Sequence, residues 1–392
     1  MRREIDKRAM AALSGGHLAT DFANGALPAL LPFLVARFDL SYTLAALIML
    51  AWATSSSVIQ PVFGLVSDRR GAVWLLPAGL VVGGVGMALA AAAPSYWVVV
   101  ALVALSGLGT AAYHPEGSKF AAYVSGRRRA TGMSYFSIGG NLGYALGPLA
   151  ATVLVLELGL RGGLLLAVPS VLAATVLFGV LPYLRTFEPV TGRHGGLADE
   201  SRPGALGLLL GVITFRSLAW FGLLTFVPLW EVSLGHSEAY GGRLLAVMLL
   251  AGGLGTLAAG PLADRLGRRP VLTASTVATG PLILAYLALG GIAGAVALAL
   301  VGVCVIGTFG VTMVMSQEYL PRHIGMASGL SIGFSIGLGG VAAVALGALA
   351  DSIDLRTALY VSAAAPFAAV LLCLLLPPER AGRSLAPEPA SL

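Results

Sequence analysis

The sequence has few charged residues and little cysteine. Charged side chains make up 11% of the 392 residues and hydrophobic ones 57%, with a mean hydropathy of +0.88, which excludes an ordinary soluble domain. The two cysteines, Cys304 and Cys373, lie in different apolar segments, so no disulfide framework is expected. The sequence contains no phosphate-binding GxxxxGK(S/T) pattern, and we expect no nucleotide, metal or other cofactor.

Apolar segments long enough to cross a bilayer recur along the whole chain. A transmembrane helix needs roughly 20 mostly apolar residues, and about twelve such segments are separated by short polar breaks. We therefore predict an all-α membrane protein with twelve transmembrane helices. The first segment is too long for a cleaved signal peptide and is interrupted by Asp21. The expected spans are residues 10–36, 42–66, 72–92, 96–122, 130–157, 162–184, 205–230, 240–263, 270–291, 294–318, 325–350 and 356–376.

Lysine and arginine are distributed unevenly over the polar breaks. Cytoplasmic loops of membrane proteins carry the excess of both residues. With the amino terminus inside, nineteen basic residues fall on the inner side, Arg216 lies within a segment, and the outer side has only Arg37, Arg161, Arg243 and Arg356. Both termini are therefore predicted to be cytoplasmic. The net charge of +6 follows from this topology, so no nucleic-acid partner is expected.

Two sequence motifs occur twice, separated each time by about half of the 392 residues. GLVSDRRGA begins at Gly64 and GPLADRLGRR at Gly260, while ATGMSYFSIGG begins at Ala130 and ASGLSIGFSIG at Ala327. Parallel repeats are typical of transporters whose halves rock around a midplane site. The repeats predict two pseudo-symmetric six-helix bundles, residues 1–185 and 205–392, joined by a polar cytoplasmic linker over residues 186–204.

The first repeated motif resembles the signature loop of the major facilitator superfamily. The pattern Gly-x-x-x-Asp-Arg-x-Gly-Arg-Arg is complete in the second copy, whereas Ala72 and Val73 replace the closing basic pair of the first copy. The resemblance implies the major facilitator fold and a latch that closes the cytoplasmic side. Its aspartates can cap a neighbouring helix start, and its arginines can pair with acidic groups. The alternative is that these charges set the topology alone. The expected latch residues are Asp68, Arg69, Asp264, Arg265 and Arg268.

Three further stretches carry a closer resemblance. They are GHLATDFANGALPALLPFL from Gly16, YHPEGSKFA from Tyr113 and QEYLPRHIGMASGLSIGFSIGLGG from Gln317. Together with the length and layout of the chain, they resemble the fosmidomycin-resistance type of bacterial drug efflux carriers. The resemblance implies a proton-coupled antiporter of the bacterial cytoplasmic (inner) membrane that exports a small drug or toxic compound by alternating access and so confers antibiotic resistance.

The expected partners are a small-molecule substrate, protons and the lipid bilayer, and we expect the chain to function as a monomer. Proton-coupled uptake of a small metabolite or organic anion by the same fold is an alternative that the sequence leaves open. An intramembrane enzyme is a distant alternative, because the duplicated halves favour rocking. The histidines and carboxylates of the two polar segments also match no metal-ligand pattern.

A polar stripe lies within the first apolar segment. His17, Asp21 and Asn24 share one face of the expected helix. At a rise of about 1.5 Å per residue, Asp21 lies near the bilayer midplane, where a lone ionised carboxylate is costly. Such an acid takes up a proton readily, and a nearby imidazole can share it. We predict that Asp21 and His17 couple transport to protons and that Asn24 lines the substrate cavity. The alternative is a hydrogen-bonded pair that only fastens this helix to a neighbour.

The segment at 96–122 places His114 and Glu116 on either side of Pro115, which bends a helix. The two side chains are two residues apart, so they do not face one cavity. We expect His114 to face the pathway as a third proton-coupling residue. Glu116 is expected to form a packed gate pair with Lys119 or with a signature-loop arginine.

Three other segments, 130–157, 205–230 and 294–318, contribute candidate residues. Gly143, Gly147 and Pro148 resemble the Gly-x-x-x-Gly-Pro motif of antiporters in this superfamily, although small residues at this spacing also permit close helix packing. Arg216 lies within the segment at 205–230. Its guanidinium can bind an anionic or phosphonate-like cargo, or it can be the structural partner of a carboxylate. The residues assigned to the substrate cavity here are Asn141, Arg216 and Trp220, and Glu318 is expected to pair with an arginine in the gate.

Overall fold

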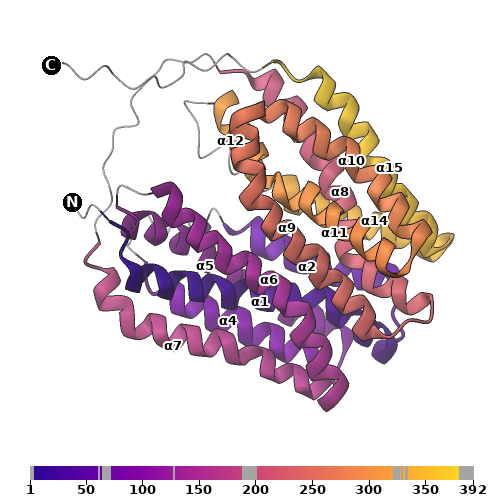
Figure 1. Cartoon of the computed structure of the whole chain (residues 1–392). Coiled ribbons are helices and arrows are strands. Elements are labelled where there is room, and N and C mark those ends of the chain that lie inside the picture. The colour runs from indigo at the N-terminus through magenta and orange to yellow at the C-terminus, as the bar shows by residue number, and fades with distance from the viewer. Residues whose placement is uncertain are drawn as a thin grey trace.

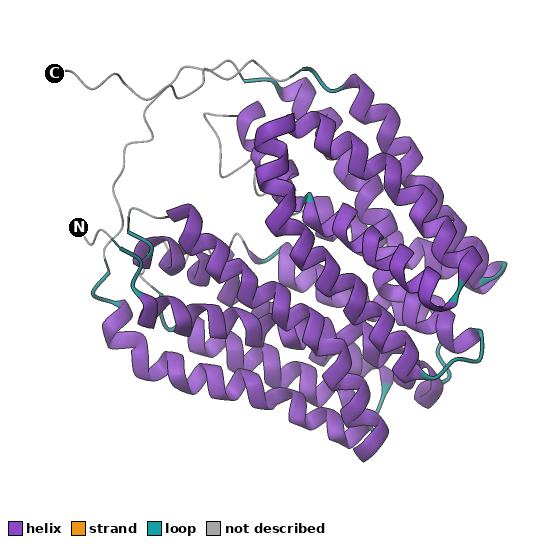
Figure 2. Ribbon diagram, in the orientation of Figure 1, coloured by secondary structure: helices purple, strands orange, loops and turns teal. Residues whose placement is uncertain are grey.

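The computed structural model describes residues 4–60, 62–63, 72–126, 129–187, 201–320, 327, 330–331 and 334–378. Every secondary-structure element in these ranges is a helix (Figure 2). The all-α prediction is therefore confirmed. By length and composition, ten helices of the described residues are long and apolar enough to cross a membrane.

The first half of the chain lies at the lower left of Figure 1. Its elements follow the expected spans, with the span at 162–184 covered by η1 and α7 together and the span at 42–66 described only in part. The elements are α1 (Lys7–Phe38), α2 (Tyr42–Ser57), α4 (Leu75–Ala91), α5 (Tyr96–Val124), α6 (Arg129–Leu158), η1 (Leu160–Leu166) and α7 (Ala167–Leu184).

The second half lies at the upper right of Figure 1. The span expected at 294–318 is divided into α11 and α12 at Thr308, and the span at 325–350 ends in η2 and α14. The elements are α8 (Pro203–Ser233), α9 (Glu238–Leu266), α10 (Arg268–Leu289), α11 (Gly291–Gly307), α12 (Phe309–Tyr319), η2 (Phe334–Leu338), α14 (Gly339–Ser352) and α15 (Leu355–Leu375). The linker predicted at 186–204 falls mostly outside the described residues.

Side-chain caps set where several helices begin. Asp6 accepts a hydrogen bond from the Ala9 amide at 3.0 Å and so begins α1, and Ser41 caps α2 in the same way. Asp354 caps α15 by accepting the Thr357 amide at 2.7 Å, which lowers the pKa of the Asp354 carboxyl. Polar residues thus stand at the breaks between the apolar segments.

The helices give the molecule two faces. The Asp6 amide donates to the carbonyl of Val124 at 2.9 Å, so α1 begins beside the end of α5. The Arg202 amide donates to the carbonyl of Tyr319 at 2.7 Å, so α8 begins beside the end of α12. We call the face with these helix ends the terminal face. The far face is the opposite one, where α1 ends at Phe38 and α2 begins.

A row of glycines lets α1 and α6 pack backbone to backbone. A Cβ atom added at Gly139, Gly143 or Gly147 would lie 2.0–2.3 Å from a carbonyl oxygen of α1. No larger residue fits without moving a helix. The antiporter-like motif therefore has the packing role that the sequence offered as its alternative, and we call these three glycines the glycine seam.

The two halves meet through α2 against α14 and α6 against α9. Among the described residues, the hydrogen bonds between halves are all made by Asp351 at the far face. Its carboxylate accepts the backbone amides of Tyr42 at 2.7 Å and Thr43 at 2.9 Å, and the Thr43 hydroxyl at 2.5 Å. Asp351 thus caps α2 across the interface, and the far face is closed.

Candidate functional site in the central cavity

A cavity of about 310 Å³ lies between the two halves. Both halves contribute polar and aromatic side chains to it. From the first half these include Asp21, Asn24, Trp52, Thr110, His114, Asn141 and Tyr144, and from the second Arg216, Ser217, Trp220, Phe221, Phe309, Thr312, Ser331 and Ser335. Residues that the sequence analysis predicted for the site therefore line one cavity, namely Asp21, Asn24, His114, Asn141, Arg216 and Trp220.

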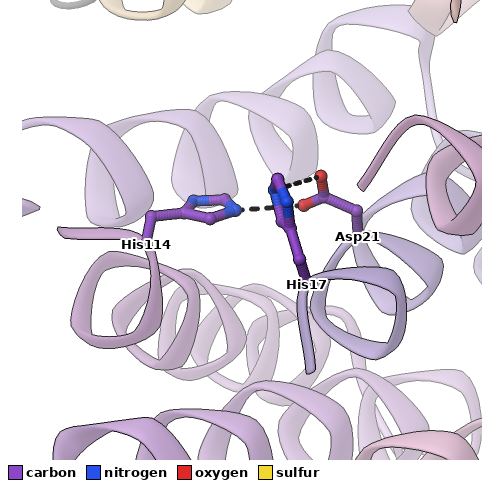
Figure 3. A group of neighbouring side chains, drawn as sticks. All are labelled: His17, Asp21 and His114. Atoms are coloured by element: carbon purple, nitrogen blue, oxygen red, sulfur yellow. Dashed lines mark ion pairs between the residues drawn. The ribbon is translucent and has the colours of Figure 1, made fainter. Parts of the chain in front are cut away.

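Two neighbouring histidines face the carboxylate of Asp21, as Figure 3 shows, and their rings meet edge to face with centroids 5.2 Å apart. The Nε2 atom of His17, one turn earlier on α1, lies 3.2 Å from Oδ2 of Asp21. The Nε2 atom of His114, from α5, lies 3.2 Å from Oδ1. Two imidazoles that can carry a proton therefore face the two oxygens of the carboxylate, and these are the three residues that the sequence analysis grouped for proton coupling.

His17 lies behind Asp21 and is not part of the cavity lining. Its Nδ1 atom donates to the Phe136 carbonyl at 2.8 Å, and its ring stacks on the Phe136 ring with centroids 4.1 Å apart. A Cβ atom at Gly140 would lie 2.5 Å from the His17 Nε2 atom and 2.7 Å from Oδ2 of Asp21. A glycine at this position of α6 therefore leaves the space that the His17–Asp21 pair fills.

On α5, His114 and Glu116 point to different surroundings, as their spacing indicated. His114 lines the cavity. Glu116 is fully buried, and its Oε2 atom lies 2.7 Å from the Lys119 ammonium. Lys119 is one of the two partners that the sequence analysis offered for Glu116. The pair lies on α5, so Glu116 is packed within the first half.

Arg216 is buried in the second half, where its described partners are all neutral. One terminal nitrogen donates to the Ser275 and Thr276 hydroxyls at 3.1 and 2.7 Å. The other donates to the Thr308 hydroxyl at 2.5 Å and to the carbonyls of Cys304 and Val305. The carboxylate partner that the sequence offered as an alternative is therefore absent from the described contacts, and a buried cation without a counter-ion is expensive.

The expected latch residues are only partly visible. Asp68 and Arg69 lie outside the described residues. Asp264 and Arg265 are exposed at the end of α9, and the next helix, α10, begins after Gly267 without a side-chain cap, so Asp264 does not cap it. Arg268 donates to Glu318, which is the arginine pair expected for that glutamate. This ion pair lies within the second half and does not join the halves.

The spacing of His17, Asp21 and His114 would also admit a metal ion, which the sequence patterns did not indicate. One ligand atom from each residue lies within 4.8 Å of the others. Imidazole and carboxylate are ligand types that zinc takes. His17 and Asp21 lie on α1 and His114 lies on α5, so the packing of two helices brings the three residues together. No sequence motif could indicate such a metal site.

Sequence reasoning missed several residues of the cavity lining and its surroundings, and two of them, Trp52 and Asp351, make hydrogen bonds that matter for the site or its closure. Trp52 lines the cavity and its indole nitrogen donates to Oδ1 of Asn24 at 3.0 Å. Asp351 closes the far face. A lone carboxylate at the end of an apolar segment was a usable signal for Asp351, whereas nothing distinguishes Trp52 from other aromatic residues of the chain.

Comparisons with known proteins agree with this arrangement. A family model described as the Major Facilitator Superfamily matches residues 13–331 and 209–391. A fosmidomycin resistance protein of Escherichia coli (strain K12) is 30% identical over 385 residues, which cover 95% of this chain and 93% of that protein. An uncharacterized MFS-type transporter of Bacillus subtilis (strain 168), YfnC, is 32% identical over 373 residues, which cover 92% and 90%.

Solved structures with the same arrangement of helices are more distant in sequence. A variant of the nucleoside transporter NupG gives a TM-score of 0.77 at 12% identity, covering 94% of this chain and 99% of that chain. A bacterial homologue of the human lysosomal transporter Spinster gives a TM-score of 0.72 at 14% identity and covers 94% of each chain. Likeness at these identities concerns the fold alone.

Proposed function

Because this chain belongs to the major facilitator superfamily, we propose that it is a proton-coupled antiporter that exports a small drug or toxic compound across the bacterial inner membrane. The two halves, residues 1–185 and 205–392, rock about the central cavity so that it opens to one side at a time. The chain acts as a monomer. Fosmidomycin is the first cargo to test, because the E. coli relative is named for resistance to it.

The observation that supports this proposal is the carboxylate of Asp21, which lines the cavity and is faced by two neighbouring imidazoles. His17 and His114 each approach it to 3.2 Å. An ionisable group at this depth is costly and marks proton pathways in transporters. A proton taken from the outside neutralises the acid, and cargo from the inside takes its place in the next half of the cycle. Protonation of Asp21 and cargo occupancy therefore exclude one another.

The electrical energy of one proton is sufficient for useful export. One charge that crosses 100 mV contributes about 2.3 kcal/mol, which corresponds to a roughly fortyfold concentration ratio. A pH gradient adds to this ratio. The transporter needs no nucleotide for that work.

The excess of Lys and Arg places the terminal face in the cytoplasm. The far face, where Asp351 joins the halves, is then external, and we propose that this arrangement is an inward-facing state. The exposed Asp264 and Arg265 fit this assignment, because a cytoplasmic latch is disengaged when the cytoplasmic side is open. Asp351 is the external counterpart of that latch.

Replacing Asp351 by alanine is expected to shift the two-state balance toward the outward-facing state. Loss of a helix cap costs about 1 kcal/mol, which is roughly fivefold in the ratio of the states. Distances between spin labels on the two halves at the far face measure this ratio. Glu157→Ala is the matched control. Glu157 is also an exposed carboxylate, and it lies near the end of α6 at the far face. An unchanged distance distribution in Asp351→Ala would contradict the latch.

Inside-out vesicles with an acidic lumen test the function itself. Fosmidomycin is expected to accumulate inside them while protons leave, and a protonophore is expected to abolish the accumulation. Cargo that moves in the same direction as protons would replace export by the uptake alternative. Accumulation that survives the protonophore but stops on addition of a metal chelator would replace the proton by a metal ion at Asp21.

A further inference from the structure

The amide of Asn24 has one possible orientation in the cavity wall. The indole nitrogen of Trp52 only donates hydrogen bonds, and it lies 3.0 Å from Asn24 Oδ1. The atom that faces Trp52 must therefore be the amide oxygen, since an amide nitrogen there would place two donors together. The Asn24 Nδ2 atom is consequently turned to Asp21, whose Oδ1 atom it reaches at 3.0 Å.

The same amide also receives a hydrogen bond from α5. The Thr110 hydroxyl lies 3.0 Å from Oδ1 of Asn24, so α1, α2 and α5 meet at one amide group. Asn24 and Thr110 are each 3% exposed and Trp52 is 7% exposed, which keeps water from replacing these partners. Hydrogen bonds in such a setting hold their geometry better than bonds at a surface.

These contacts determine which oxygen of Asp21 can carry a proton. Oδ1 accepts from Asn24, and His114 approaches that oxygen at 3.2 Å without the alignment of a hydrogen bond. On the other side, the Phe136 carbonyl accepts from His17 Nδ1, so the Nε2 atom of His17 is left to face Oδ2 of Asp21. Among the described contacts Oδ2 accepts from no amide, so it is the oxygen left to bind the exchangeable proton. Both imidazoles lie 3.2 Å from the carboxylate, and neither makes an aligned hydrogen bond with it.

We infer that Asn24 is a positioning residue that keeps Oδ1 of Asp21 an acceptor, and that the Trp52 indole connects this bond to the cargo cavity. Cargo packed on the exposed part of the indole holds Trp52 against Asn24. The Asn24 donor then favours the ionised carboxylate, so cargo and the ionised Asp21 stabilise one another. By reciprocity, a proton on Asp21 weakens cargo binding. The inference rests on the proposed proton coupling and supplies its linkage.

Several other groups face Asp21 and are common to every variant below. The titratable ones are His17 of α1, Tyr113 and His114 of α5, and Tyr144 of α6. Arg216 of α8 is the charged residue on the opposite cavity wall. None of these residues is altered when Trp52 or Asn24 is replaced, so a change in the titration of Asp21 reports the relay.

The test is an infrared titration of the Asp21 carboxyl in the purified full-length protein, with the band assigned by its loss in Asp21→Asn. Trp52→Phe keeps an aromatic ring and removes only the N–H donor. Asn24→Leu removes the amide at similar volume. Each replacement is expected to raise the pH at the midpoint of the Asp21 titration, by about one unit for Asn24→Leu and by less for Trp52→Phe. The double variant is expected to match Asn24→Leu alone, because both act through one bond.

Trp220→Phe is the matched control, since Trp220 lines the same cavity and makes none of the hydrogen bonds of the relay. It is expected to leave the titration midpoint in place. Thermal unfolding of each variant shows whether it is folded. Two results would overturn the relay but leave the proton-coupling proposal standing. One is a folded Trp52→Phe variant with the titration midpoint of the unaltered protein, and the other is a double variant whose shift is the sum of the two single shifts. A chain in which no Asp21 band titrates would overturn the proton-coupling proposal, and the relay with it.

Discussion

Asp21→Asn is expected to abolish proton-driven accumulation of cargo. The amide has the shape of the protonated acid, which contacts His17 and His114, but it neither gains nor loses a proton near neutral pH. The accumulation ratio across energised vesicles is expected to fall from roughly fortyfold toward one. Flow of labelled fosmidomycin and fluorescence of a pH dye, measured in the same vesicles, record the cargo and the protons.

Exchange of labelled for unlabelled cargo shows whether Asp21→Asn has lost only its coupling to protons or has also lost the ability to bind and move cargo. This exchange needs no net proton movement, so Asp21→Asn is expected to retain it. Glu157→Gln, which neutralises an exposed carboxylate of α6, is expected to retain both exchange and accumulation. Unchanged proton flux in Asp21→Asn would remove this residue from the mechanism.

Arg216→Gln is expected to weaken the binding of an anionic cargo on the order of tenfold to a hundredfold. This is the range for losing a hydrogen bond to a charged group. The partners of Arg216 are neutral hydroxyls and carbonyls, so its charge is not balanced by a described carboxylate. We propose that an anionic group of the cargo supplies that balance. The half-saturating concentration of fosmidomycin in exchange measures the effect.

Two further variants separate charge from packing at this position. Arg216→Lys keeps the charge but not the planar fork of donors, and intermediate affinity is expected. Arg243→Gln removes an exposed arginine of α9 and is expected to bind cargo normally. If Arg216→Gln lowers the thermal stability but leaves the half-saturating concentration unchanged, Arg216 holds α8 to its neighbours and does not bind cargo.

The expected spans and the stripe on α1 could be read from the sequence, because both follow from periodicity within one segment. His17 and Asp21 are four residues apart, and this spacing places their side chains on one face of the helix, where they approach to 3.2 Å. The spacing of His114 and Glu116 likewise indicated that they face different surroundings. Local geometry was sufficient in each case.

The partners supplied by other helices could not be read in this way. The Phe136 carbonyl that orients His17, the indole of Trp52 and the cap provided by Asp351 all depend on which helices pack together. The number of residues between Asp351 and Tyr42, on opposite halves, carries no information about their contact. The same limit applies to Arg216, for which the sequence offered an anionic cargo or a carboxylate, whereas the packing supplies hydroxyls and carbonyls.

The glycine seam has a consequence for the way in which the acid senses each side of the membrane. It fastens α1 to α6, and the described side chains that form an ion pair or hydrogen bond with Asp21 all come from the first half. A rocking motion of the halves therefore carries the acid with its neighbours as one rigid cassette. What alters for Asp21 during a cycle is the opposite wall, with the charge of Arg216 and the access of water. The protein would then tune its acid by changing the surrounding medium, with its hydrogen-bond partners kept constant.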